Sequence, residues 1–82
     1  MSADTAIPSG IDRITIIPGL CNGKPTIRGL RITVETILGF MAAGDSRDDI
    51  LAEYPLLEAA DIDACLAFAS RMASRRYAVD PT

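Results

Sequence analysis

The segment that decides the fold is Thr33–Gly44, which reads TVETILGFMAAG. Its apolar residues recur at positions i, i+3, i+4 and i+7, the spacing that places side chains on one face of an α-helix. These residues are Val34, Ile37, Leu38 and Met41. Thr33 is suited to cap the first turn, and Gly44 stands where a left-handed C-terminal cap belongs. The segment therefore predicts a helix over about residues 34–43.

Two further helices are predicted after this one, separated by Pro55. Ser46, with Asp49 three positions later, resembles a capping box that uses Asp in place of Glu, so a short helix is expected over residues 46–53. A third helix is expected over about residues 59–76, because its apolar residues form one stripe. The stripe consists of Ile62, Cys65, Leu66, Ala69, Met72 and Ala73.

The chain before Thr33 has the composition of strands and turns. Residues 13–17 are rich in β-branched side chains and are followed by Pro18, a pattern typical of a strand that ends in a turn. A second extended segment is expected over residues 26–32. The fold is thus predicted to be mainly α: a short N-terminal β-hairpin or strand pair, then a three-helix, homeodomain-like (helix-turn-helix) bundle.

A chain of 82 residues has room for one domain. We expect that domain over residues 13–76, with a flexible leader over 1–12 and a loose tail over 77–82. No stretch has the roughly 20 apolar residues that span a bilayer, and no signal peptide is recognisable, so a cytoplasmic location is expected. A domain this small buries a limited share of its surface, which favours a dimer.

The composition argues against catalysis. Histidine is absent, and Cys21 and Cys65 lie far apart in the sequence, so neither a zinc site nor a Cys/His nucleophile can be built from them. Residues 19–26 differ from a phosphate-binding loop, because Pro25 stands where that loop needs Ser or Thr. The acidic residues gather at predicted helix starts, where capping explains several of them. We expect no enzyme activity, no cofactor and no bound metal.

The charges are segregated along the chain. Residues 13–31 hold four basic residues and no acid, whereas residues 45–63 hold seven acids and one arginine. The candidates for contacts with nucleic-acid phosphates are Lys24, Arg28 and Arg31. A tight turn that needs Gly and Pro explains the same segment equally. The last predicted helix begins with acids that repel phosphate, so we assign any DNA contact to the basic segment rather than to that helix.

A second candidate surface lies on the last predicted helix. Phe68, Arg71, Arg75 and Arg76 lie beside its apolar stripe and are the candidates for binding a partner protein. An aromatic residue bordered by arginines is typical of interface hot spots, and arginine can pair bidentately with the carboxylates of an acidic nuclease pocket. The simpler interpretation places Phe68 at the flank of the core and the arginines in water.

The segment from Ile14 to Ala69 resembles the domain of unknown function 433 (DUF433) family. The residues that carry the resemblance are Gly23, Lys24, Pro25, Ile27, Arg28, Gly29, Arg31, Ile32, Glu53, Tyr54 and Pro55. The resemblance implies a small prokaryotic protein with a helix-turn-helix-like fold. It also implies an antitoxin similar in role to VapB, which masks a PIN-like nuclease toxin and represses their shared promoter. Residues 58–60 lack the family's usual Thr-x-Glu, so a weak N-terminal cap is expected for the last helix.

Two functional hypotheses follow. The first is a non-enzymatic, antitoxin-like protein of a type II toxin–antitoxin pair, which neutralises a PIN-like nuclease by direct binding and, as a dimer, binds operator DNA. The alternative is a homodimeric protein-interaction scaffold without DNA binding, in which the N-terminal strands pair across two chains.

Overall fold

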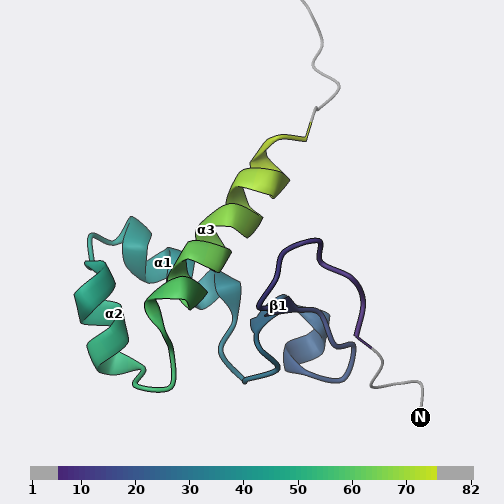
Figure 1. Cartoon of the computed structure of the whole chain (residues 1–82), viewed down its shortest axis with the longest axis horizontal. Helices are drawn as coiled ribbons and strands as arrows, with labels where there is room; N and C mark the ends of the chain where they lie inside the picture. The colour runs from purple at the N-terminus through teal and green to yellow at the C-terminus, as the bar shows by residue number, and fades with distance from the viewer. Residues whose placement is uncertain (1–5, 76–82) are drawn as a thin grey trace, which may run out of the picture.

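The structure is a computed structural model that describes residues 6–75 (Figure 1). Its elements, in chain order, are β1 (Ile14–Thr15), the 3-10 turn η2 (Cys21–Gly23), β2 (Thr26–Ile27), α1 (Val34–Ala42), α2 (Arg47–Glu53) and α3 (Ala59–Ala73). The predicted fold class, a mainly α chain in which a strand pair precedes three helices, is confirmed. No helix among residues 6–75 has both the length and the apolar character needed to cross a membrane.

The strand pair is shorter than the sequence predicted. β1 and β2 are antiparallel, with Ile14 opposite Ile27 and Thr15 opposite Thr26. Their extended backbone ends abruptly, because Arg13 (φ 74°) and Arg28 (φ 48°) both adopt left-handed conformations. The two turning residues remain joined, since the Arg28 N–H donates to the Arg13 carbonyl at 2.8 Å. The hairpin therefore closes with two arginine side chains at the same end.

The segment before β1 is held to the domain, although the sequence predicted a flexible leader up to residue 12. The Ile7 N–H donates to the Ile16 carbonyl at 2.7 Å, and the Ser9 hydroxyl lies 2.8 Å from the Ile14 carbonyl. On the other side of the hairpin, the Ile27 N–H donates to the Ile32 carbonyl at 3.1 Å. These bonds tie residues 7–9 and Ile32 to the strand pair.

Local capping residues determine where α1 begins and ends and where α2 begins. The Thr36 N–H donates to the Thr33 hydroxyl at 3.1 Å, which caps α1. At the other end of α1, Gly44 (φ 102°) adopts the left-handed conformation of a C-terminal cap. Ser46 and Asp49 form the predicted capping box of α2. The cap signals at Thr33, Gly44 and Ser46 are thus confirmed.

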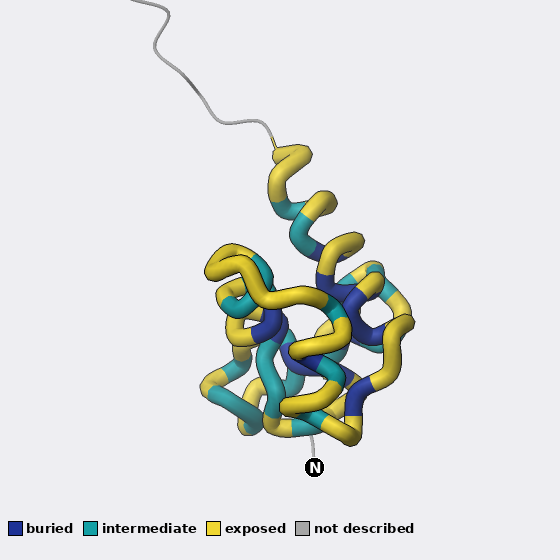
Figure 2. The backbone as a smooth tube through the Cα atoms, turned by 90° about the vertical axis from the view of Figure 1, so that its left-hand side faces the viewer, coloured by how far each residue is buried: buried dark blue, intermediate teal, exposed yellow. Residues whose placement is uncertain are grey.

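The core lies where the hairpin, α1 and the first half of α3 meet. Its members are Ile14, Ile27, Val34, Ile37, Ile50, Leu57, Ile62, Ala64, Cys65 and Phe68. The face of α3 that packs inward differs from the predicted stripe, because Leu66 is 39% exposed whereas Phe68 is 8% exposed. The second half of α3 projects beyond the rest of the molecule, and in Figure 2 it is coloured mostly as exposed or intermediate.

Candidate functional site

One of the three basic residues that the sequence assigned to DNA, Arg28, is engaged within the chain. Arg28 grips Asp61 in α3 bidentately: Nε donates to Oδ1 at 3.0 Å and Nη2 donates to Oδ2 at 2.9 Å. The same Nη2 donates to the backbone carbonyl of Leu56 at 2.8 Å. The Arg28 guanidinium is therefore held by the turn before α3 and by the first turn of that helix.

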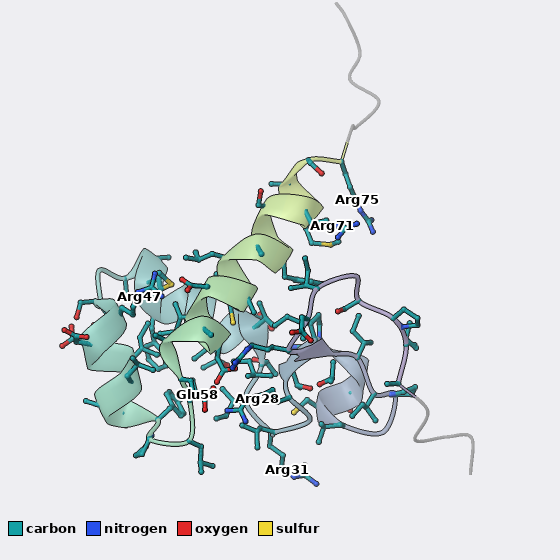
Figure 3. The ribbon with its side chains drawn as sticks, in the orientation of Figure 1. Arg28, Arg31, Arg47, Glu58, Arg71 and Arg75 are labelled. Carbon is teal, nitrogen blue, oxygen red and sulfur yellow. The ribbon has the colours of Figure 1, made fainter. Side chains whose placement is uncertain are left out.

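A second arginine completes this arrangement. Arg13 Nη1 donates to Asp61 Oδ1 at 2.9 Å and to Glu58 Oε1 at 2.8 Å. The Glu58 N–H donates to Asp61 Oδ2 at 2.8 Å, so the third residue of α3 reaches back to the N-cap residue as in a capping box. Figure 3 shows Arg28 beside Glu58 near the start of α3. We refer to Arg13, Arg28, Glu58 and Asp61 as the Asp61 cluster.

The electrostatics of the cluster favour a permanent charge on its central carboxylate. The Asp61 side chain is completely buried, and burial alone would raise its pKa. Hydrogen bonds from Arg28, from the Glu58 N–H and from Arg13 outweigh burial and lower the pKa of Asp61 to about 2. The position of Asp61 in the first turn of α3 adds the favourable field of the helix N-terminus. The cluster is therefore an ionic tie between the hairpin end and α3, centred on a buried carboxylate.

The sequence predicted Arg28 as a DNA-binding residue and indicated no site role for Arg13 or Asp61. The signal that could have identified the tie is the charge segregation itself, because a basic block and an acidic block of one chain attract each other when the fold brings them together. Arg13 and Arg28 come from the basic block, and Glu58 and Asp61 come from the acidic block. The tight-turn interpretation of the segment also fits, since Gly23 adopts a φ of 79° and Asn22 a φ of 59°.

The other two members of the candidate DNA set lie on the surface. Lys24 Nζ contacts Glu35 Oε1 at 2.9 Å in an exposed ion pair. Arg31 is exposed and has no carboxylate partner among residues 6–75. Figure 3 shows Arg31 pointing away from the body of the molecule. Only Arg31 of the three is thus free to meet a phosphate without giving up an ionic bond.

The candidate partner-binding residues separate into two groups. Phe68 is a core residue, which agrees with the simpler interpretation and removes it from the open surface. Arg71 and Arg75 are exposed at the projecting end of α3 (Figure 3). Arg71 Nη1 donates to the Gly10 carbonyl at 3.0 Å, and Arg75 has no ion pair within the described chain. Arg76 lies outside the described residues.

An apolar groove runs along the projecting end of α3. Its volume is about 510 Å³, and it lies between α1 and α3. The α3 wall comprises Phe68, Ala69, Met72 and Ala73, and the opposite wall comprises Pro25, Val34, Glu35 and Leu38. Leu38 and Met72 are partly buried against the core, whereas Ala73 is exposed. This groove can hold a row of apolar side chains.

The acids of the described residues and the core cysteine do not form a metal-binding or nucleophilic site. No group of three or more His, Cys, Asp or Glu residues among residues 6–75 is arranged to hold a metal ion. Burial raises the pKa of the Cys65 thiol to about 11, so this thiol is an inert core group. Asp49 of α2 serves the cap of its own helix, because its carboxylate accepts a hydrogen bond from the Ser46 N–H.

The family model of DUF433, whose description is "Protein of unknown function (DUF433)", matches residues 14–69, well over half of the chain. No curated protein and no solved structure matches the chain. The matched segment contains the hairpin, α1, α2, the Asp61 cluster apart from Arg13, and α3 up to Ala69.

Proposed function

The chain belongs to the DUF433 family, and we propose that it is an antitoxin-like protein of a type II toxin–antitoxin pair, which neutralises a PIN-like nuclease by binding it directly. In this proposal the protein performs no chemistry of its own. It supplies a projecting helix end whose arginines pair with carboxylates of the nuclease. The resemblance described above motivates the role, and the distribution of uncompensated positive charge supports it.

That distribution is the observation that carries the proposal. Seven of the eight Lys and Arg residues lie within residues 6–75, because Arg76 falls outside them. Four of the seven pair with carboxylates of the chain itself: Arg13, Lys24, Arg28 and Arg47. The other three have no carboxylate partner in the described part of the chain: Arg31, Arg71 and Arg75. Two of these three lie together at the end of α3.

Arginines that have no carboxylate partner within the described chain are suited to bind an acidic partner protein. A guanidinium that has no carboxylate of its own can donate two parallel hydrogen bonds to one on a partner, and this geometry makes the pair stronger than a single contact. A nuclease that binds its metal through carboxylates presents such groups in a recess. The projection of α3 beyond the core gives Arg71 and Arg75 the reach to enter it, and Arg71 need only exchange the Gly10 carbonyl for a carboxylate.

We extend the proposal to repression of the promoter, with Arg31 as the main phosphate contact. The supporting observation is that Arg31 is exposed, points outward and has no acid partner within residues 6–75 (Figure 3). Lys24 can add a second contact, because an exposed ion pair such as that with Glu35 is weak and exchanges easily. Arg28 is left out of the phosphate-binding set, since its guanidinium holds Asp61.

The test is reconstitution with the partner nuclease. The tagged full-length chain is used to isolate a stoichiometric partner from the native host, the partner is identified by mass, and its RNase activity is titrated with the chain. We expect a small nuclease that is inhibited at a 1:1 ratio. Arg71→Glu combined with Arg75→Glu should abolish inhibition, whereas Lys24→Glu combined with Arg31→Glu, the same total charge change at exposed residues outside α3, should retain it. If the chain isolates only itself, the homodimeric scaffold hypothesis replaces the antitoxin hypothesis.

A further inference from the structure

The segment before β1 extends from the hairpin to the projecting end of α3. Arg71 Nη1 donates to the Gly10 carbonyl at 3.0 Å, which joins residues 61 positions apart. A Cβ built on Gly10 would lie 3.1 Å from Nη1 and 3.3 Å from Cζ of Arg71, so the guanidinium packs directly against the glycine backbone. Figure 3 shows Arg71 on the side of α3 that faces this segment. Residues 6–12, which we call the N-terminal strap, thus hold one of the two arginines proposed above for partner binding.

The other hydrogen bonds that the described structure gives the N-terminal strap lie within it or run to the neighbouring hairpin. The Ile7 N–H donates to the Ile16 carbonyl at 2.7 Å, and the Ile11 N–H donates to the Ser9 hydroxyl at 3.1 Å. A hollow of about 500 Å³ is lined by residues 6–15 themselves, where the strap arches away from the hairpin (Figure 1). Ile11 packs against the core, whereas five of the seven strap residues are exposed: Ala6, Ile7, Pro8, Gly10 and Asp12. A segment with so few buried contacts opens locally at a small cost in free energy.

An acidic partner can replace the Gly10 carbonyl at this arginine. Arg71 is exposed, so its guanidinium is accessible from solvent. A backbone carbonyl is a neutral acceptor, whereas a carboxylate is charged and can accept two parallel N–H bonds from one guanidinium. Because the strap backbone packs against the guanidinium, turning it towards a partner breaks the bond to Gly10. Strap and partner therefore cannot hold Arg71 at the same time.

We propose that the N-terminal strap and an acidic partner compete for the Arg71 guanidinium. In the free protein the strap holds the guanidinium and weakens partner binding, and a bound partner releases the strap. The competition rests on the proposed function for the identity of the partner, because the carboxylates of the nuclease are the acidic groups that it invokes. The strap contact itself belongs to the free chain and is measured without the nuclease.

The competition relates partner binding to strap opening quantitatively. If the partner binds Arg71 when the strap is open, its apparent dissociation constant is the intrinsic constant divided by the open fraction. Exchange of the Ile7 amide hydrogen with solvent also requires opening, because that N–H is bonded to the Ile16 carbonyl. A variant that enlarges the open fraction should therefore speed this exchange and tighten partner binding by the same factor.

The first experiment measures amide hydrogen exchange of the full-length chain by NMR. Arg71→Ala removes the donor, and Gly10→Ala crowds the guanidinium and is strained at a φ of +82°. Both variants should speed exchange at Ile7 about three- to tenfold, the effect expected for the loss of one hydrogen bond. Exchange at the Val34 N–H, which is bonded outside the strap, should stay unchanged. The matched control is Arg75→Ala, which removes the neighbouring arginine and should affect neither amide.

The second experiment titrates the same proteins with a hexaglutamate peptide at low salt, as an acidic probe. Gly10→Ala should bind the peptide more tightly than the wild type, by the same factor by which it speeds exchange at Ile7. Arg71→Ala should bind the peptide more weakly, because the guanidinium is gone. The peptide should also speed exchange at Ile7 in the wild type and not in Arg71→Ala. A variant that merely loosens the domain would not gain affinity for the peptide.

Each result supports or overturns one part of the proposal. Unchanged exchange at Ile7 in Arg71→Ala overturns the strap contact. An equal increase at Val34 also overturns it, because the variants then open the whole domain. Peptide affinity that stays the same or falls in Gly10→Ala overturns the competition. The nuclease takes no part in either experiment, so failure of the strap and failure of the antitoxin role are recognised separately.

Discussion

Replacing Asp61 by Asn should destabilise the domain by an amount that depends on pH in a defined way. The substitution keeps the volume of the side chain and removes the charge that accepts hydrogen bonds from Arg13 and Arg28. In the folded chain the pKa of Asp61 falls from 3.8 to about 2. Since a pKa difference of one corresponds to about 1.36 kcal/mol, the ionised carboxylate contributes roughly 2 kcal/mol to the free energy of unfolding at neutral pH.

That contribution is large for a domain of this size. A stability of about 0.05–0.15 kcal/mol per residue gives such a chain roughly 4–12 kcal/mol in total. In domains of 60–100 residues each kcal/mol moves the melting temperature by roughly 4–8 °C, so Asp61→Asn should lower Tm by about 8–16 °C at pH 7. The matched control is Asp63→Asn on the same helix, whose exposed ion pair with Arg47 should contribute far less.

The pH dependence separates the ionic tie from a general packing defect. A carboxylate whose pKa is depressed by folding stabilises the protein above its unfolded pKa, and this stabilisation is lost as the pH falls through the folded pKa. The stability difference between wild type and Asp61→Asn should therefore be constant above about pH 4 and shrink towards zero between about pH 4 and 2. Urea denaturation at a series of pH values measures this difference. A variant as stable as the wild type at pH 7, or a difference that persists unchanged at pH 2, would refute the reasoning.

Three further predictions concern other parts of the molecule. Arg28→Ala should lower Tm clearly because it breaks the ionic contact with Asp61 in α3. Arg31→Ala should leave Tm unchanged and weaken binding to a promoter fragment, reducing the slope of log affinity against log salt by about one. Equal Tm values for the two variants would contradict the assignment. Gly29→Ala should destabilise the fold, because the backbone φ of Gly29 is +72°. Gly39→Ala should raise the free energy of unfolding by about 0.5–1 kcal/mol, because Gly39 lies inside α1 and no other part of the chain comes within 4 Å of the new Cβ. Urea titration measures both changes. In a Cys21→Ser variant, which lacks the partly buried second thiol, Cys65 should react with a disulfide reagent at pH 8 only at the rate of global unfolding, and rapid labelling of this variant in its native state would contradict the burial of Cys65.

Local signals made the secondary structure predictable. The caps at Thr33 and Ser46 depend on hydrogen bonds that span three residues, so the sequence contains both partners side by side. The strands were predicted too long for an equally local reason. β-branched side chains favour an extended backbone, but Arg28 adopts a left-handed conformation and its side chain bonds to Asp61. A contact between residues 33 positions apart overrode the preference of the segment that contains it.

The rotation of α3 and the Asp61 cluster could not be predicted from the sequence, for a different reason. The apolar stripe of α3 covers a wide arc, and the sequence does not show which part of that arc faces the hairpin. Leu66 was assigned to the core and Phe68 to an interface, yet their exposed fractions are 39% and 8%. Once Asp61 turns towards Arg13 and Arg28, the rotation of the helix is fixed, because Phe68 lies two turns further along nearly the same face. The ionic contact thus determines which apolar residues are buried.

Most of the basic residues inside the family match are paired with carboxylates of the chain, whereas Arg71 and Arg75 after it are not. The matched segment, residues 14–69, includes Arg28, whose guanidinium holds the fold together, and it ends before Arg71 and Arg75. The match thus includes three of the four residues of the Asp61 cluster, Arg28, Glu58 and Asp61. Arg71 and Arg75 come after the match, and neither has a carboxylate partner within residues 6–75. If the proposed function holds, substitutions at these two arginines should change nuclease binding without opening the Asp61 cluster, because neither side chain contacts it.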